Sequence, residues 1–173
     1  MDEIARAAEI SRQGLYLQFT NKEALFRAAV RHELDAGLDD VSRALNEEGV
    51  GLERRVVAAL DAWLGRYVGS MLASDIGNLL RNPAMELGDT VDPASTAFDA
   101  RLAAAISDAM PENDRRRLGV TPEDVASALH LVAQGAKYLS NARRESREEF
   151  RARISTGVRV VFAGFGTTAK RTP

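Results

Sequence analysis

The stretch from Asp2 to Val30, DEIARAAEISRQGLYLQFTNKEALFRAAV, contains two short helical segments and the beginning of a third. A polar turn at Glu9–Ser11 separates a predicted helix over 2–8 from a second one over 12–18. Two short helices joined by a three-residue turn are typical of a helix-turn-helix unit, whose second helix enters the major groove of DNA. The stretch therefore predicts an N-terminal DNA-binding module.

The leading edge of the second helix carries side chains that suit DNA. Ser11 is the expected N-cap, Arg12 suits guanine or phosphate, and Gln13 suits the edge of adenine. Tyr16, one turn further on, can donate its hydroxyl to a phosphate, and Lys22 in the first turn of the next helix adds positive charge near the backbone. The residues expected to form the inner side of the module are Ile4, Ala7, Ala8, Leu15, Phe19 and Leu25.

The remaining chain reads as a series of helices, without the alternating pattern of strands, so we predict an all-α protein. The expected helices are one from a Thr20–Glu23 capping box to about 46, one over about 52–73, one opened by Asp92-Pro93, one over 122–142 after Thr121-Pro122, and one over 147–165 after a Ser146–Glu149 capping box. Between 75 and 92 we expect one short helix that ends before Pro83, then a loop through Gly88.

Composition excludes several classes of protein. The 173 residues are 45% hydrophobic and 28% charged, which is an ordinary globular mixture. The absence of cysteine excludes disulfides, thiolate metal sites and cysteine nucleophiles. A net charge of −2 argues against indiscriminate nucleic-acid binding but allows a local basic surface. No apolar run is long enough to span a membrane, so we expect a soluble, cytoplasmic protein.

The motifs of the N-terminal stretch resemble those of one family. They are IA..A at Ile4, Ala5 and Ala8, S...LY..F at Ser11, Leu15, Tyr16 and Phe19, and K..L at Lys22 and Leu25. This combination resembles the DNA-binding module of tetracycline-repressor (TetR) regulators, over about the first 35 residues. The resemblance implies a homodimer that binds double-stranded operator DNA and a small-molecule effector. It also implies that Ser11, Arg12, Gln13, Tyr16 and Lys22 face the DNA.

Three features depart from the family pattern. Glu9 stands in the turn where the family usually has glycine, and Gly14 stands where a small hydroxyl residue often contacts phosphate. Family members also carry a helix before the position of residue 2, which closes a three-helix bundle. We therefore expect the biological chain to extend N-terminally of Met1.

We expect two parts, a DNA-binding module with its connecting helix over 1–46 and an effector-binding, dimer-forming domain over 47–173. The expected effector wall consists of Trp63, Tyr67 and Met71 at helical spacing, with Met85, Phe98 and Leu102 closing the same space. The alternative, that these side chains only fill the core, is the favoured interpretation from the sequence.

The last two predicted helices carry more apolar surface than one neighbour within the chain needs. We expect them to pair with a second copy in a four-helix bundle, and the alternative is an internal core. The proposed interface residues are Val125, Leu129, Val132, Phe150, Ile154, Val158, Val161 and Phe162.

Other polar groups favour plain structural interpretations. His130, Gln134, Lys137 and Asn141 share one side of a helix, for which an exposed face is favoured over a binding site. The chain has only two histidines, so His32 near Asp35 and Asp39 does not make a full metal site. We expect Arg115 to Arg117 to be a solvated helix end before Gly119.

The sequence thus predicts a ligand-responsive DNA-binding regulator, most simply a repressor, without metal or cofactor. An alternative is a helical sensor or interaction protein that does not bind DNA. An enzyme is disfavoured, because the sequence has no nucleophile–base pair and no phosphate-binding loop.

Overall fold

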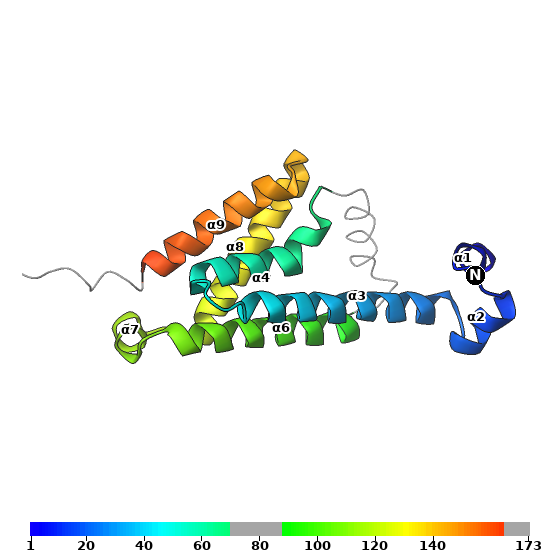
Figure 1. The fold of residues 1–173 in the computed structure, drawn as a ribbon, viewed down its shortest axis with the longest axis horizontal. Coiled ribbons are helices and arrows are strands. Elements are labelled where there is room, and N and C mark those ends of the chain that lie inside the picture. Colours follow the sequence, from blue (N-terminus) through cyan, green and yellow to red (C-terminus); the bar gives the residue numbers. More distant parts are fainter. Residues whose placement is uncertain (70–87, 165–173) are drawn as a thin grey trace, which may run out of the picture.

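The computed structural model describes residues 1–69 and 88–164 as helices joined by turns (Figure 1). The elements are α1 (Asp2–Ala7), α2 (Arg12–Gln18), α3 (Lys22–Leu45), α4 (Leu52–Leu64), the 3₁₀-helix η1 (Gly65–Tyr67), α6 (Gly88–Ala109), α7 (Glu112–Leu118), α8 (Pro122–Arg143) and α9 (Arg147–Ala163). These ranges contain no strand, and the all-α prediction is confirmed.

The helices form a body with a small module at the end of one long helix. α3 runs beside α6, and α4, α8 and α9 pack with them (Figure 1). We use "body" for α4, η1, α6, α7, α8 and α9 together with the C-terminal half of α3. α1 and α2 lie beyond the N-terminal end of α3, away from the body.

The predicted capping box at Thr20–Glu23 is wrong by one residue. Asn21 caps α3, because its side-chain oxygen accepts a hydrogen bond of 2.7 Å from the N–H of Ala24. Asparagine is at least as good an N-cap as threonine. Glu23 instead forms an ion pair of 3.2 Å with Arg27 one turn later.

The starts of the last two long helices are confirmed. Ser146 and Glu149 form the predicted capping box at α9, and Thr121 forms another with Asp124 at α8, before Pro122. The backbone N–H of Thr121 and then its hydroxyl donate to Asp124, which holds the pKa of that carboxyl below its ordinary value. Each box satisfies donors that the first helical turn leaves without partners.

The helix predicted over about 52–73 is shorter in the structure. α4 ends at Leu64 and is followed by η1, whose first residue, Gly65, lies close to its neighbours. A Cβ there would lie 2.1 Å from Oδ1 of Asp61 and 3.0 Å from a ring carbon of Phe150. Asp61 itself is buried and paired with Arg147 of α9 at 2.9 Å.

α6 begins before the predicted start at Asp92-Pro93. Gly88, predicted to lie in a loop, is its first residue, and Pro93 lies inside the helix. A proline this close to the start removes one intrahelical hydrogen bond without ending the helix. The short helix expected before Pro83 lies outside the described residues.

The triple arginine marks a helix end, as predicted, but two of its members hold the body together. α7 ends at Leu118, and Gly119 follows with a φ of 66°. Arg115 donates to the carbonyl of Ser107 at 2.7 Å, and Arg117 donates to that of Gly164 at 2.8 Å. These bonds tie α7 to α6 and to the end of α9.

One apolar core joins the helices of the body. Trp63 of α4 stacks on Phe98 of α6, with ring centroids 5.2 Å apart and planes 7° from parallel. The apolar stripes predicted on the helices supply the fully buried members, among them Val41, Val56, Leu60, Leu102, Ile106, Leu129, Phe150, Ile154 and Val158. The C-terminal half of α3 therefore belongs to the same core as α4 to α9.

Candidate nucleic-acid interface

A small apolar cluster fixes the angle between α1 and α2. Ala5 and Leu15 are buried, and Ile4, Phe19 and Leu25 are half-buried beside them. The predicted inner positions of Ala7 and Ala8 are wrong, since both residues are exposed. Ala5, earlier in α1, is the buried alanine instead.

The turn between α1 and α2 contains a residue in the left-handed backbone region. Glu9 has a φ of 55°. Its N–H donates to the carbonyl of Arg6 at 3.2 Å, and the N–H of Ile10 donates to that of Ala5 at 3.0 Å. This pair of bonds is the Schellman pattern of helix ends, in which glycine is usual. The geometry of the turn is thus kept with a glutamate.

All five residues predicted to face DNA lie on the surface: Ser11, Arg12, Gln13, Tyr16 and Lys22. Ser11 caps α2, accepting a hydrogen bond of 2.9 Å from the N–H of Gly14. A Cβ at Gly14 would lie 3.1 Å from the Ser11 hydroxyl, so the missing side chain leaves room for the cap.

Arg12 is held on two sides. Its Nε lies 2.9 Å from a carboxylate oxygen of Asp2 in an ion pair, and its guanidinium carbon lies 5.6 Å from the centre of the Tyr16 ring. The ion pair with Asp2 is at Nε, so the two terminal nitrogens can still form the paired hydrogen bonds with which arginine binds guanine or phosphate. Arg12 and Tyr16 therefore form one contact surface.

One exposed residue of α2 was missed by the sequence analysis. Leu17 leaves 82% of its surface exposed, far more than Tyr16 at 44%. It lies one turn after Gln13 and therefore on the same side of the helix. The only signal in the sequence was an apolar residue two positions from the buried Leu15, off the buried side.

Comparison with known families gives one match, at this module. Residues 1–29 match the family of bacterial regulatory proteins called the tetR family. The N-terminal module is that of a TetR-family regulator. The match spans α1, α2 and the beginning of α3, so the chain contains a TetR-type DNA-binding module followed by a helical body.

Comparisons with curated proteins and with solved structures give no match. Across the described ranges, no helix combines the length and the apolar character needed to cross a bilayer. In the same ranges, no three His, Asp or Glu side chains converge as metal ligands would, and His32 is exposed.

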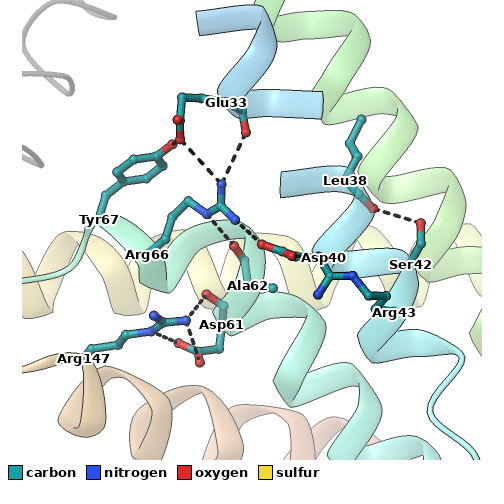
Figure 2. A network of polar contacts seen from close by, with 10 residues as sticks. All are labelled: Glu33, Leu38, Asp40, Ser42, Arg43, Asp61, Ala62, Arg66, Tyr67 and Arg147. Carbon is teal, nitrogen blue, oxygen red and sulfur yellow. Dashed lines mark hydrogen bonds and ion pairs between the residues drawn. The ribbon is translucent and has the colours of Figure 1, made fainter. Parts of the chain in front are cut away.

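The TetR-type module is linked to the body through α3, and one arginine makes several of the contacts (Figure 2). Arg66 of η1 donates to the carbonyl of Glu33 at 3.3 Å and forms ion pairs with the side chains of Glu33, at 3.7 Å, and Asp40. It also donates to the carbonyl of Ala62 in α4 at 3.2 Å. Arg66 therefore joins the end of α4 to two turns of the helix that carries the module.

Tyr67 adds a second contact at the same place. Its hydroxyl donates to the Glu33 carboxylate at 3.4 Å, and its ring lies 5.6 Å from the ammonium nitrogen of Lys137 in α8. Burial is the largest of several effects on the phenol, and its pKa is raised. One half-buried tyrosine thus touches both α3 and α8.

The predicted effector wall does not form as one helical stripe. Trp63, Phe98 and Leu102 are buried in the core, whereas Tyr67 lies in η1 after α4 has ended. Met71 and Met85 lie outside the described residues. A hollow of about 460 Å³ beside Arg66 is lined by charged side chains rather than by this wall: Asp40, Arg43, Glu47, Arg66 and Arg147, with Ala44 and Ala62.

His130 is not on an exposed face, and that prediction is wrong. Only 12% of its side chain is exposed. Its Nδ1 lies 2.7 Å from a carboxylate oxygen of Asp99, and its ring makes a T-shaped contact with Phe98, with ring centroids 4.9 Å apart. Gln134 and Asn141 are exposed as expected. The His130–Asp99 pair joins α8 to α6.

The predicted dimer residues are divided between the core and the surface. Val125, Leu129, Phe150, Ile154 and Val158 are buried within the single chain, so their assignment to an interface is corrected. These side chains fill the space between α8, α9 and the rest of the body. Val132 is exposed, and Val161 and Phe162 are half-buried.

Other apolar side chains of α8 and α9 do reach the surface. Leu131, Tyr138 and Val160 are 71%, 70% and 69% exposed, and Leu139 is also exposed. The excess of apolar surface that the sequence indicated therefore exists, but mostly on residues other than those predicted.

Proposed function

We propose that this TetR-type regulator is a homodimeric repressor, which a small-molecule effector releases from its operator. The observation that supports this most is the position of α2. It carries exposed Arg12, Gln13 and Tyr16 beyond the N-terminal end of α3, whose C-terminal half is part of the body core. A change in the body can therefore move α2 without changing α2 itself, as effector control of DNA binding requires.

We assign DNA binding to residues 1–46 and effector binding with dimerisation to residues 47–173. The two parts share α3, since Leu38, Val41 and Leu45 pack in the body core. Two copies would bind half-sites roughly 34–36 Å apart, or a multiple of that distance.

The exposed apolar residues of α8 and α9 support the dimer. Two such helices from each copy can form a four-helix bundle. Leu131, Tyr138 and Val160 are large and mostly exposed, and full burial of such side chains contributes about 1.5–3 kcal/mol each. Gly135 lies among them on α8, with open space where a side chain would be, which allows a second helix to approach closely.

The effector is proposed to bind beside Tyr67, where charged side chains can contact it. This residue contacts Lys137 of α8 and Glu33 of α3, so a molecule that displaces it would change the support of α3. The mechanism is a population shift, in which the effector favours the arrangement of the two modules that does not fit the operator.

Electrophoretic mobility of DNA from upstream of its own gene, with the full chain, tests DNA binding. We expect a retarded band whose intensity falls with increasing salt. A thermal-shift screen of small molecules then identifies the effector, because a ligand specific to the folded state raises its stability. The same molecule should abolish the retarded band and raise transcription from a reporter under this upstream DNA.

The outcomes separate the rival functions. Ligand binding without any retarded band would favour a sensor that does not bind DNA. A retarded band that the ligand strengthens, with higher reporter transcription, would contradict the repressor assignment while leaving the DNA-binding module in place.

A further inference from the structure

Leu17 is an apolar side chain that the fold of the module does not use. It is 82% exposed, whereas Leu15, two residues earlier on α2, is 3% exposed. Two residues correspond to about 200° around an α-helix, so Leu17 points almost directly away from the small core. Its exposure therefore needs an explanation outside the packing of α1 and α2.

The neighbours of Leu17 are groups that suit the major groove. Gln13 lies one turn earlier on the same side of α2, and the Arg12–Tyr16 pair occupies the adjoining side. Leu17 thus lies next to the polar side chains on the surface of the module, and this module is the part of the chain that matches the tetR family.

The major groove offers one apolar group to such a side chain. Guanine, cytosine and adenine present hydrogen-bond donors and acceptors there, whereas thymine also presents its 5-methyl group. Glutamine pairs best with the adenine edge, so α2 combines the two side chains that suit neighbouring A·T base pairs.

We propose that Leu17 packs against the 5-methyl group of a thymine, adjacent to the A·T pair that Gln13 contacts. The inference rests on the proposed operator binding through α2. It makes Leu17 a specificity-determining residue, which selects thymine over cytosine at one position of each half-site.

The test uses the thymine methyl group itself. The full chain is first used to select its preferred sequence from a pool of random-sequence duplexes. Each selected thymine is then replaced by deoxyuridine, which lacks only the methyl group. For the wild-type protein, replacing the thymine that Leu17 touches should weaken binding about fourfold for each half-site so changed.

Leu17→Ala completes a double-mutant cycle. This variant should bind the thymine duplex about as weakly as the wild type binds the deoxyuridine duplex, and deoxyuridine should weaken it little further. Gln18→Ala, at an exposed neighbouring position of α2, is the matched control and should keep the full dependence on the methyl group. The thermal unfolding of both variants should match the wild type, because both side chains are exposed.

Three results would overturn the inference. They are wild-type binding that does not change with deoxyuridine at any position, an equal loss in the wild type and in Leu17→Ala, and a selected sequence without thymine. If the wild type selects no sequence from the pool, the proposed operator binding fails as well, and the two failures are thereby distinguished.

Discussion

Glu9 adopts a left-handed backbone conformation at the turn between α1 and α2, which costs a residue with a Cβ roughly 1–2 kcal/mol. Glu9→Gly should therefore stabilise the module. The gain should be about 0.5–1 kcal/mol, because glycine also makes the unfolded chain more flexible. Hydrogen exchange of the α1 and α2 amides measures this locally, where a melting curve of the whole chain can miss it.

Gly119→Ala is the matched control for this effect. Gly119 has a φ of 66°, and a Cβ there would meet nothing within 4 Å, so only the backbone conformation is affected. The substitution should destabilise the end of α7 by about 1 kcal/mol. Unchanged or faster exchange in Glu9→Gly would show that the φ of Glu9 is not a source of strain.

Lys22 should contribute charge rather than sequence preference. Replacing it with alanine leaves one phosphate in each half-site without its cation, so the slope of log K against log salt should fall by about 0.9 for each such phosphate. The selected DNA sequence and the oligomeric state should not change. Arg116→Ala, on exposed α7 at the far end of the body, should leave the slope unaltered.

At the scale of single residues, exposure followed from the sequence more readily than partners did. The surface positions of Arg12, Gln13 and Tyr16 agree with the pattern of buried Leu15. The pairing of Arg12 with Asp2 and of His130 with Asp99 depends on how separate helices cross, which periodicity along one helix does not contain. Leu17 was missed because the sequence does not show which residues surround an apolar side chain that lies opposite the buried side of its helix.

Among the elements, α8 and α9 form a hairpin held by one carboxylate. Glu145 accepts hydrogen bonds from Ser140 at 2.8 Å and Arg153 at 2.5 Å, at a turn where Arg144 has a φ of 56°. The bond from Arg153, followed by that from Ser140, holds the pKa of Glu145 below its ordinary value.

The lowered pKa gives a dependence of stability on pH. A carboxyl whose folded-state pKa is depressed stabilises the fold above its unfolded pKa, and this contribution is lost as pH falls through the folded pKa. Glu145→Gln should lower Tm at neutral pH and reduce the further loss of Tm on acidification. A Tm profile of Glu145→Gln that runs parallel to the wild-type profile from pH 7 to strongly acidic pH would contradict this role. Glu148→Gln, at an exposed position in the first turn of α9, is the control.

Helix boundaries marked by a local cap were more predictable than boundaries without one. Ser146 and Thr121 mark α9 and α8 because caps act within a few residues of the sequence. No local signal marked the change from α4 to η1 at Gly65, where Asp61 and Phe150, the latter far away in the chain, occupy the space of a side chain. The N-cap of α3 was predicted one residue too early, because Thr20 and Asn21 are both good caps.

For the molecule as a whole, the proposed dimer predicts which substitutions separate folding from assembly. Leu131→Arg with Val160→Arg should leave the chain folded, since both side chains are mostly exposed, and should convert a dimer into monomers. Light scattering after size-exclusion chromatography measures the mass, and operator affinity should fall with it. Ala104→Arg, at an exposed position of α6, should change neither property. A double variant that stays dimeric would exclude this face.

From the sequence alone, apolar residues buried within one chain could not be distinguished from apolar residues exposed to a second copy. Periodicity predicts that Val158 and Ile154 lie on an apolar side of α9, but not whether the same chain or a second copy covers them. Both are buried by the chain's own helices, and the surface available to a partner lies beside them, at Val160.

Arg66 should transmit the effector's influence. Arg66→Ala removes the bonds between this side chain and α3, so the molecule found by thermal shift should still bind but should release DNA less effectively. Without effector, operator affinity should stay within a few-fold of wild type, and the coupling free energy should fall by about 1 kcal/mol or more. Arg54→Ala, exposed on α4, should keep the coupling intact. Undiminished release in Arg66→Ala would assign transmission to other residues.

The length of α3 has a mechanical consequence. Its 24 residues span about 36 Å, so it acts as a lever whose fulcrum lies in the apolar core. A tilt of about 5° about Val41 carries the tip at Lys22, about 29 Å away, by about 2.5 Å, which is most of the rise of one base pair. A rearrangement near Arg66 too small to disturb the packing of the core could thus shift each DNA-binding tip out of register with its groove.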